Sequence, residues 1–307
     1  MAAWLGVDIG GTNTRVGLVD DGGLIAARGF PTRPAAGVGP WAERLRQEAA
    51  ELRGPDPLGV GVACAGVLDI KTGVVLHALN LPLFNGQALV GLVSEALGLP
   101  AVLENDANLY ALGEQSFGAG QGHADLVCLT LGTGVGGGLI MDGRLVRGPL
   151  GSAGEIGHIL VVGDGRLCGC GARGCLEAYA SATGLRGMLV EALDAGRQTS
   201  LGREDSVAAM GAAALAGDEL ARELFAVAGM ALGRAFADLI CTLGLDLIIL
   251  GGGVSRSWEM MRPAAHEELA RRLRVLDPAR VRVIAGALGD DAPVLGAAAL
   301  ARQLLAR

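Results

Sequence analysis

Three cysteines and one histidine lie close together in the stretch GEIGHILVVGDGRLCGCGARGC, residues 154–175. His158, Cys168, Cys170 and Cys175 have the spacing H-x9-C-x-C-x4-C. One histidine with three cysteines is a closed ligand set for structural Zn²⁺, and the glycines between them would let the chain turn tightly around an ion. The alternative is one histidine among buried free thiols, but a Cys-x-Cys pair beside a third cysteine is uncommon packing. The spacing therefore predicts a zinc site.

Two glutamates lie beside these predicted zinc ligands. Glu155 precedes His158 by three residues, and Glu177 follows Cys175 by two. Closing the chain around zinc would draw both carboxylates into one neighbourhood, where they could accept hydrogen bonds from sugar hydroxyls. The second ring nitrogen of a metal-bound His158 could donate to a hydroxyl. The alternative is that both are ordinary surface glutamates. Their fixed spacing around the predicted metal site argues against this alternative.

A third carboxylate stands where a predicted strand gives way to a helix, in VLENDANLYALGE (102–114). Asp106 could be the N-cap of that helix, a position that Asp often fills. It could instead be a general base that accepts a hydroxyl proton during phosphoryl transfer. The stretch alone favours the cap, and Asn105 and Asp106 could divide the two roles.

Three glycine-rich turns follow apolar strands: DIGGTNT (8–14), LGTGVGGG (131–138) and LGGGVS (250–255). Backbone N–H groups in such turns can approach phosphate oxygens closely. Thr12 and Asn13 add side-chain donors, and Asp8 could contact magnesium-bound water. Each turn alone is better explained as a tight hairpin. Three of them in one chain favour a nucleotide site.

Familiar nucleotide-binding motifs are absent from the sequence. It has no G-x-x-x-x-G-K-[ST], and its single lysine, Lys71, follows no phosphate loop, which excludes a P-loop enzyme. It has no H-R-D or D-F-G of a protein kinase and no G-x-G-x-x-G between a first strand and a helix. The charge of a transferring phosphoryl group would then be met by Mg²⁺ and backbone dipoles, with Arg15 as a further cation.

The elements that carry these turns are repeated. Residues 126–147 repeat the N-terminal strand–turn–strand pattern, so that Gly10 lies over Gly132 and Asp20 over Asp142. Further strands are predicted at 58–66, 100–105, 245–255 and 281–286, and helices at 41–53, 89–98 and 290–307. This order predicts two duplicated α/β domains that face each other.

Length and composition agree with two soluble domains. The chain has 307 residues, which exceeds a single hydrophobic core, and 51% of them are hydrophobic and 19% charged. The net charge of −7 argues against nucleic-acid binding. No signal peptide and no apolar run of about 18 residues is found, so we expect a cytoplasmic protein with no membrane contact and reduced thiols. Cys64, Cys128 and Cys241 lie in apolar runs and are expected in the core.

The motifs together resemble the ROK family (repressors, open reading frames and sugar kinases). The resemblance covers nearly the whole chain and rests on DIGGTNT, ENDAN, LGTGVGGG, GEIGH, CGCGARGCLEA, LGGGVS and APVLGAA. It implies a two-domain α/β, actin-like ATPase (hexokinase/ribonuclease H-like) fold with ATP and sugar in the interdomain cleft. It also implies a small domain of residues 1–117 plus 293–307, and a larger domain of residues 118–292 that carries the zinc site.

The resemblance also implies roles for individual residues. Asp106 would take the proton from a hexose 6-hydroxyl, and ATP would be bound with Mg²⁺. The residues near ATP would be Asp8, Gly10, Gly11, Thr12, Asn13, Gly132, Thr133, Gly134, Gly252 and Gly253. The residues at the sugar would be Gly66, Asn105, Asp106, Glu155, His158 and Glu177. Proteins of this family are commonly homodimers or homotetramers.

Within the family the sequence is most similar to bacterial glucokinases. HALNLPLFNG (77–86) lacks the Trp that glucokinases often place after the Asn-Leu pair, and Leu83 and Phe84 stand there instead. A kinase for N-acetylmannosamine or another hexose is therefore an alternative. A repressor would carry a helix-turn-helix domain before the first turn, where only about four residues precede the strand. A non-catalytic sugar sensor would not need Asp106. We expect an ATP-dependent hexose kinase.

Overall fold

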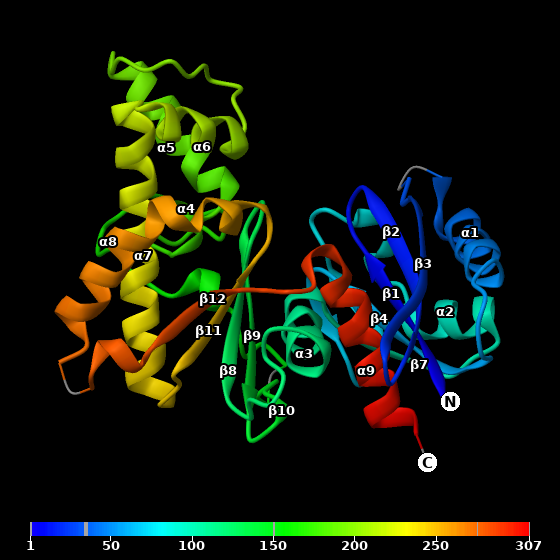
Figure 1. The fold of residues 1–307 in the computed structure, drawn as a ribbon. Coiled ribbons are helices and arrows are strands. Elements are labelled where there is room, and N and C mark those ends of the chain that lie inside the picture. Colours follow the sequence, from blue (N-terminus) through cyan, green and yellow to red (C-terminus); the bar gives the residue numbers. More distant parts are fainter. Residues whose placement is uncertain (1, 34–35, 150, 275, 307) are drawn as a thin grey trace. The chain divides into compact units, whose positions relative to one another are not determined.

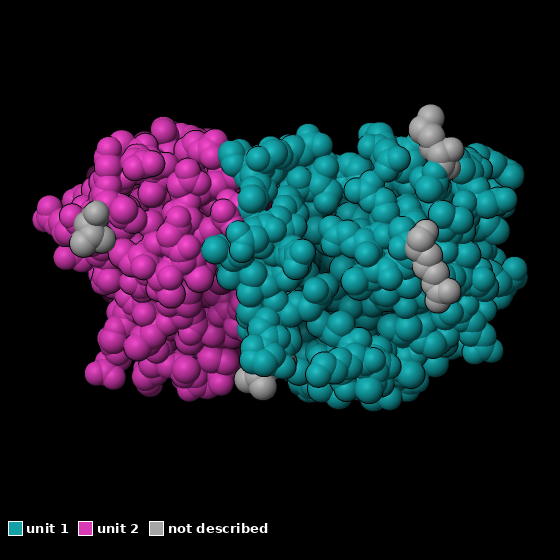
Figure 2. Space-filling model, turned by 90° about the horizontal axis from the view of Figure 1, so that it is seen from below, with its two compact units in different colours: residues 1–124, 138–153, 286–307 teal, residues 125–137, 154–285 magenta. Residues whose placement is uncertain are grey.

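The computed structural model describes residues 2–33, 36–149, 151–274 and 276–306. The chain divides into two compact units, coloured separately in Figure 2. Unit 1 consists of residues 1–124, 138–153 and 286–307, and unit 2 of residues 125–137 and 154–285. The domain boundaries expected from the sequence differ from this division, because residues 118–124, 138–153 and 286–292 pack with unit 1.

Unit 1 is built on a five-stranded mixed sheet. The strands are β1 (Ala3–Ile9), β2 (Asn13–Asp20), β3 (Gly23–Pro31), β4 (Pro57–Cys64) and β7 (Ala101–Asn105). Their spatial order is β3-β2-β1-β4-β7, with β1–β2 and β2–β3 antiparallel and β1–β4 and β4–β7 parallel. A separate hairpin is formed by β5 (Val67–Asp69) and β6 (Val74–His77). The central strand β1 is apolar along almost its full length because helices cover both faces of the sheet.

Helices cover the sheet of unit 1 (Figure 1). Helices α1 (Val38–Ala50) and α2 (Leu89–Leu97) pack on one face, where Trp41 and Leu45 join the core formed by Leu5 and Val7 of β1. Helices α3 (Asp106–Phe117) and α9 (Ala292–Leu305) pack on the other face, with Trp4 against Leu295.

The backbone of helix α9 packs directly against the backbone of the sheet. A Cβ atom on Gly6 of β1 would collide with the carbonyl of Val294, and one on Gly61 of β4 would collide with the carbonyl of Ala297. These two glycines are therefore required by the close approach of the helix. The small residues of the C-terminal stretch APVLGAAALA suit the same contact.

The second sheet repeats the order of the first. Its strands are β8 (Leu126–Leu131), β9 (Val135–Met141), β10 (Arg144–Leu145), β11 (Leu247–Gly251) and β12 (Arg282–Ala285). Their order is β10-β9-β8-β11-β12, with β9–β10 antiparallel and β8–β11 and β11–β12 parallel. Position by position this is the order of unit 1, which confirms the repeated pattern that the two glycine turns predict.

The helices of unit 2 are α4 (Glu177–Ala180), α5 (Ala182–Asp194), α6 (Val207–Ala216), α7 (Glu219–Leu243) and α8 (Trp258–Arg272). Among the described residues, α7 is long and apolar enough to cross a membrane by length and composition, which the sequence analysis did not expect. Its most apolar 18-residue window is 67% buried inside the structure, as in the core helix of a folded domain.

One expectation about the cysteines is wrong. Cys64 and Cys128 are buried as expected, but Cys241 is exposed. It lies in an apolar run of α7, where its neighbours Leu239 and Ile240 are buried. A helix rotates successive side chains by about 100°, so one member of an apolar run can face outward.

Candidate functional site

The first glycine turn, between β1 and β2, is closed and braced by hydrogen bonds within unit 1. The N–H of Gly10 donates to the carbonyl of Asn13 over 2.9 Å. The residue that follows β3 supplies the brace: Thr32 donates its N–H to the carbonyl of Thr12 (2.8 Å) and its hydroxyl to the carbonyl of Gly10 (2.7 Å). The carbonyl of Asn80 lies so close to Gly11 that a Cβ there would approach it to 3.0 Å. The turn is a preformed backbone loop.

Three parallel strands of unit 1 end beside this turn. Ile9, Cys64 and Asn105 are neighbours in register across β1, β4 and β7, so the residues that follow them emerge at one edge of the sheet. This edge, at the carboxyl ends of parallel strands, is where α/β proteins commonly bind ligands. It brings Asp106 to the turn that follows Asp8.

The carboxylates of Asp8 and Asp106 interact electrostatically. Burial, followed by the negative charge of Asp106, raises the pKa of Asp8 to about 7. Arg15, directly opposite Asp8 across β1 and β2, opposes that rise. Burial and the same two carboxylates raise the pKa of the Cys64 thiol to about 12. A concentration of negative charge of this kind suits a divalent cation.

Helix α3 begins directly after this edge, and its cap is Asn105. The side-chain oxygen of Asn105 accepts hydrogen bonds from the N–H groups of Ala107 (3.0 Å) and Asn108 (3.3 Å). Asp106 is the first residue of the helix, so the capping role that its position suggested belongs to its neighbour. The Asp106 carboxylate lies in the first turn, at the positive end of the helix dipole.

Gly66 has a structural reason to be glycine. Its φ is 114°, which favours glycine, and a Cβ would come within 2.5 Å of the carbonyl of His77. It packs on the strand that leads to Asn80, close to the first turn. This packing accounts for the residue type.

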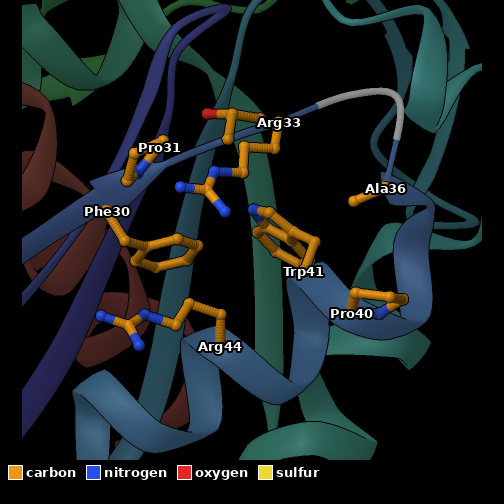
Figure 3. Close-up of a pocket in the computed structure, with 8 residues that line it drawn as sticks. Phe30, Pro31, Arg33, Ala36, Pro40, Trp41 and Arg44 are labelled. Carbon is orange, nitrogen blue, oxygen red and sulfur yellow. The ribbon is translucent and has the colours of Figure 1, made fainter.

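A cavity of about 310 Å³ lies behind the first turn, and none of the predicted site residues lines it. Figure 3 shows the side chains of Arg33 and Arg44 beside Phe30 and Trp41. The indole of Trp41 donates to the hydroxyl of Thr14 (2.9 Å), which is 3.0 Å from that of Thr32. Buried hydrogen bonds therefore connect the wall of this cavity to the brace of the first turn.

The second glycine turn, in unit 2, is braced by a more distant segment. The N–H of Gly132 donates to the carbonyl of Gly134 (2.9 Å), and the N–H of Val135 donates to Oε2 of Glu177 (3.0 Å). The N–H of Ala182 donates to the carbonyl of Gly132 (2.8 Å). Thr183 donates its hydroxyl to the carbonyl of Thr133 (2.8 Å).

The third glycine stretch lies against the second turn. A Cβ on Gly252, whose φ is 82°, would collide with the backbone of Leu131. No atom lies within 4 Å of the position that a Cβ would take on Gly132 or on Gly253, so open space adjoins both residues. The structure thus gathers Gly132, Thr133, Gly134, Gly252 and Gly253 at one edge of unit 2.

The histidine and the three cysteines form one cluster in unit 2. The ligand atoms of His158, Cys168, Cys170 and Cys175 all lie within 4.8 Å of one another. Nδ1 of His158 is 3.8 Å from Sγ of Cys168, and Sγ of Cys170 is 3.8 Å from Sγ of Cys175. Four ligands at about 2.3 Å from a tetrahedral Zn²⁺ are separated by about 3.8 Å. The donor set and its spacing therefore fit zinc, and none of the six cysteines forms a disulfide.

Local structure accounts for this arrangement. The N–H of Gly171 donates to the carbonyl of Cys168 (2.9 Å), which closes the CGCG turn, and isolated β-bridges pair Leu160 with Cys175 and Leu167 with Arg173. Burial raises the pKa of the Cys168 thiol to about 12 in the metal-free protein. A metal ion would have to displace that proton to bind the thiolate.

The predicted sugar ligands of unit 2 lie beside the cluster. While Nδ1 of His158 faces the thiols, its Nε2 lies 4.0 Å from Oε2 of the exposed Glu155. Glu177 touches the cluster and the second turn at once: its Oε1 is 3.6 Å from Sγ of Cys168 and its Oε2 binds Val135 N–H. The two nitrogens of His158 thus face the cysteine cluster and an exposed carboxylate.

Comparison of the sequence with protein-family models identifies the family. The model of the ROK family matches residues 4–304. The chain belongs to the ROK family. The ROK chain is 35% identical to a glucokinase of Thermotoga maritima over 97% of both proteins. It is 38% identical to a glucokinase of Streptomyces coelicolor over 99% of this chain and 98% of the relative.

Solved structures agree with this assignment. The crystal structure of a ROK family glucokinase from Streptomyces griseus in complex with glucose and AMPPNP superimposes with a TM-score of 0.81. That protein is 36% identical in sequence, and the match covers 98% of this chain and 100% of the other. The likeness confirms the actin-like ATPase fold expected from the motifs.

Sequence reasoning assigned no role to Glu104, Arg147 or Thr32. Glu104 is fully buried and bonds Arg147, and Thr32 braces the first turn. A charged residue inside the apolar strand AVLEN is the signal that could have drawn attention to Glu104. Its partner, 43 residues later, has no comparable signal.

Proposed function

We propose that this ROK protein is an ATP-dependent hexose kinase that phosphorylates the 6-hydroxyl of its sugar, with glucose as the first candidate. Near full-length similarity to bacterial glucokinases supports the activity. The observation that carries the mechanism is the start of α3, where Asn105 takes the cap and Asp106 stands at the strand edge beside Asp8.

In this proposal Asp106 is the general base. Its carboxylate accepts the proton of the sugar 6-hydroxyl while the hydroxyl oxygen forms a bond to the γ-phosphorus of ATP. The bond between that phosphorus and the β–γ bridging oxygen breaks, and ADP leaves with its electron pair. Sugar 6-phosphate and protonated Asp106 result, and the carboxylate is regenerated by loss of the proton to water.

The glycine turns bind the nucleotide in this proposal. Backbone N–H groups of Gly11 and Gly134 donate to phosphate oxygens, and Gly10, Gly132, Gly252 and Gly253 border the nucleotide, because the N–H groups of Gly10 and Gly132 already close their turns. The hydroxyls of Thr12 and Thr133 and the amide of Asn13 add donors. Mg²⁺, when bound, would neutralise phosphate charge, and Asp8 would hold it through water. Because the pKa of Asp8 is about 7, we expect turnover to fall as the pH drops below 7.

In this proposal the sugar is bound by Gly66, Asn105, Asp106, Glu155, His158 and Glu177. The oxygen of Asn105 is occupied by the helix cap, so its NH₂ group is the part offered to a hydroxyl. Zn²⁺, held by His158 and the three cysteines, would have a structural role, fixing the position of Glu177 and of the His158 ring.

The decisive experiment replaces the base. We expect Asp106→Asn to lose at least about 10³-fold in kcat while glucose and ATP still bind, because the amide keeps the shape but accepts no proton. Asp56→Asn, at an exposed carboxylate, is the matched control and should be unchanged. ADP release measures turnover and calorimetry measures binding. Loss of sugar binding with turnover per bound sugar unchanged would contradict the assignment of Asp106.

The identity of the hexose is tested with a panel of glucose, mannose, fructose, N-acetylglucosamine and N-acetylmannosamine. One observation keeps the alternatives open: Phe84, near where glucokinases often place a Trp, is fully buried and packs edge-on against Trp41, with ring centroids 4.9 Å apart. It therefore offers no ring to a sugar. Turnover with N-acetylmannosamine alone would identify that kinase, and folded, zinc-loaded protein inactive on every sugar would favour a sensor.

The proposal extends to the setting of the enzyme. We place it in the cytoplasm, where its six free thiols stay reduced. We also propose a homodimer or homotetramer, which light scattering after size exclusion would measure.

A further inference from the structure

One fully buried carboxylate of unit 1 has no place in the mechanism above. Glu104, the residue before Asn105 in β7, has 0% exposed surface. Its Oε2 lies 2.5 Å from Nε of Arg147. Its Oε1 accepts hydrogen bonds from the N–H of Asn105 (2.9 Å) and from Nδ2 of Asn108 (3.0 Å). A carboxylate in such a place is stable only when a cation and hydrogen-bond donors replace its water.

The contacts of Glu104 lie on both sides of Asp106 in the sequence. One fixes the peptide N–H of Asn105, directly before Asp106, and another fixes the side chain of Asn108, two residues after it. The cap formed by Asn105 spans the same residues through Ala107 and Asn108. The backbone on both sides of Asp106 is thus held by side-chain oxygens of two consecutive residues, Oε1 of Glu104 and Oδ1 of Asn105.

Arg147 ties this point to a second segment. It lies just after β10, and its carbonyl accepts the N–H of Ala153 (3.1 Å). Its side chain is 32% exposed, while that of Glu104 is fully covered, so the ion pair reaches from the protein surface to the end of β7. The pair is more protected from solvent than an ordinary surface ion pair, so its loss should change the protein more than the loss of a surface pair does.

We propose that the Glu104–Arg147 ion pair positions the catalytic base: it sets the orientation of the Asn105–Asp106 segment and so aims the Asp106 carboxylate. Neither residue touches the substrate, and both act through Asp106. The proposal rests on the function assigned to Asp106 above. A misplacement of about 1 Å at a reacting group can cost roughly 100-fold in rate.

The test removes the cation and follows kcat and KM separately. We expect Arg147→Met to lower kcat by about 10- to 100-fold while KM for sugar and ATP stays within about twofold. Arg147→Lys should recover part of the loss, because an ammonium supplies the charge without the planar fork of the guanidinium. The matched control is Arg46→Met, which breaks the exposed pair with Glu43 in the same unit and should leave kcat unchanged.

A double variant separates positioning from the cost of an unpaired buried charge. Glu104→Gln/Arg147→Met leaves no charge at the site and should fold even if Arg147→Met does not. If the pair positions Asp106, kcat of the double variant stays low. If the pair only satisfies a buried charge, the double variant recovers the full kcat, and the proposal is wrong.

Hydrogen exchange gives a readout that needs no activity. The N–H groups of Ala107 and Asn108, which donate to the Asn105 cap, should exchange faster in Arg147→Met than in the wild type, and those of α1 should not. Unchanged exchange together with unchanged kcat would overturn the proposal. If the wild type phosphorylates no sugar, or Asp106→Asn keeps its turnover, the proposed function fails instead, and the exchange result still reports whether the pair holds this segment.

Discussion

The two glycine turns occupy equivalent places in two sheets of the same strand order, yet they are held in different ways. In unit 1 the turn is braced by Thr32, about 20 residues further along the chain, directly after β3. In unit 2 the turn is braced from a segment more than 40 residues away, through Glu177 and Thr183. A repeated fold thus preserves the shape of a loop without preserving what stabilises it.

The difference follows from what lies between the strands. The first unit places a helix directly after its three-stranded meander, whereas the cysteine cluster and α4 come between β10 and the helices of unit 2. Glu177 contacts both Cys168 and the N–H of Val135, so the metal cluster and the second turn share one carboxylate. We expect the second turn, and not the first, to depend on metal.

Removal of the metal should have the largest effect. Cys170→Ser is expected to lose Zn²⁺ and more than about 4 kcal/mol of unfolding free energy, the stabilisation that a ligand supplies at about a thousand times its Kd. Sugar affinity should fall too, because Glu177 and His158 are no longer fixed. Metal analysis, urea unfolding and calorimetry measure these effects, with exposed Cys241→Ser as the control. A zinc-free variant with normal sugar affinity would show that the metal is incidental.

The charge at the first turn comes next. The pKa of Asp8 is raised to about 7, so the folded protein holds a proton there that the unfolded chain releases near pH 4. Stability from this source is therefore lost as the pH rises from about 4 to 7 and is constant above that. Asp8→Asn should lack this decline. The change in its free energy of unfolding from pH 4 to pH 8 should therefore be more favourable than that of the wild type by up to about 4 kcal/mol. Urea unfolding without nucleotide measures this difference. A variant with the pH dependence of the wild type would contradict this reading.

Two neighbouring glycines of the second turn sharpen the comparison further. A Cβ on Gly134 would collide with Oε2 of Glu177, whereas one on Gly132 would meet no atom within 4 Å. We expect Gly134→Ala to cost about 1–3 kcal/mol by overpacking, and Gly132→Ala to cost much less. Gly132→Ala should instead raise KM for ATP, because the methyl group enters the space proposed for phosphate. Equal losses of stability in the two variants would refute the brace by Glu177.

An effect comparable to that of Gly134→Ala is expected at the brace of the first turn. Thr32→Val keeps the shape of the side chain but removes its hydroxyl, leaving the carbonyl of Gly10 without that donor. A buried acceptor without a partner costs about 1–3 kcal/mol, and KM for ATP should rise modestly. Thr242→Val, which removes an exposed hydroxyl bonded to the carbonyl of Asp238, is the control and should be nearly neutral. Equal behaviour of the two variants would mean that Thr32 braces nothing.

Sequence predicted the elements that depend on local pattern. The apolar runs of β1, β4, β7 and β11 and the repeat of the glycine turns are visible in the residues themselves, and so is the H-x9-C-x-C-x4-C cluster. Glu177 could be assigned to a ligand site from its distance to Cys175, but its bond to Val135 could not. Contacts such as Glu104 with Arg147 depend on which segments the fold brings together, and no local pattern encodes that.

Helix α9 has a consequence for how the chain matures. It covers one face of the first sheet, fitting against Gly6 and Gly61, but it follows all of unit 2 in the chain. During synthesis the part of this face that α9 covers, next to Gly6 and Gly61, therefore stays uncovered until α9 (Ala292–Leu305) has been made. Domains usually fold in the order in which they emerge, and an uncovered apolar face invites misassembly. The unit that is made first is thus the unit that can be completed only last.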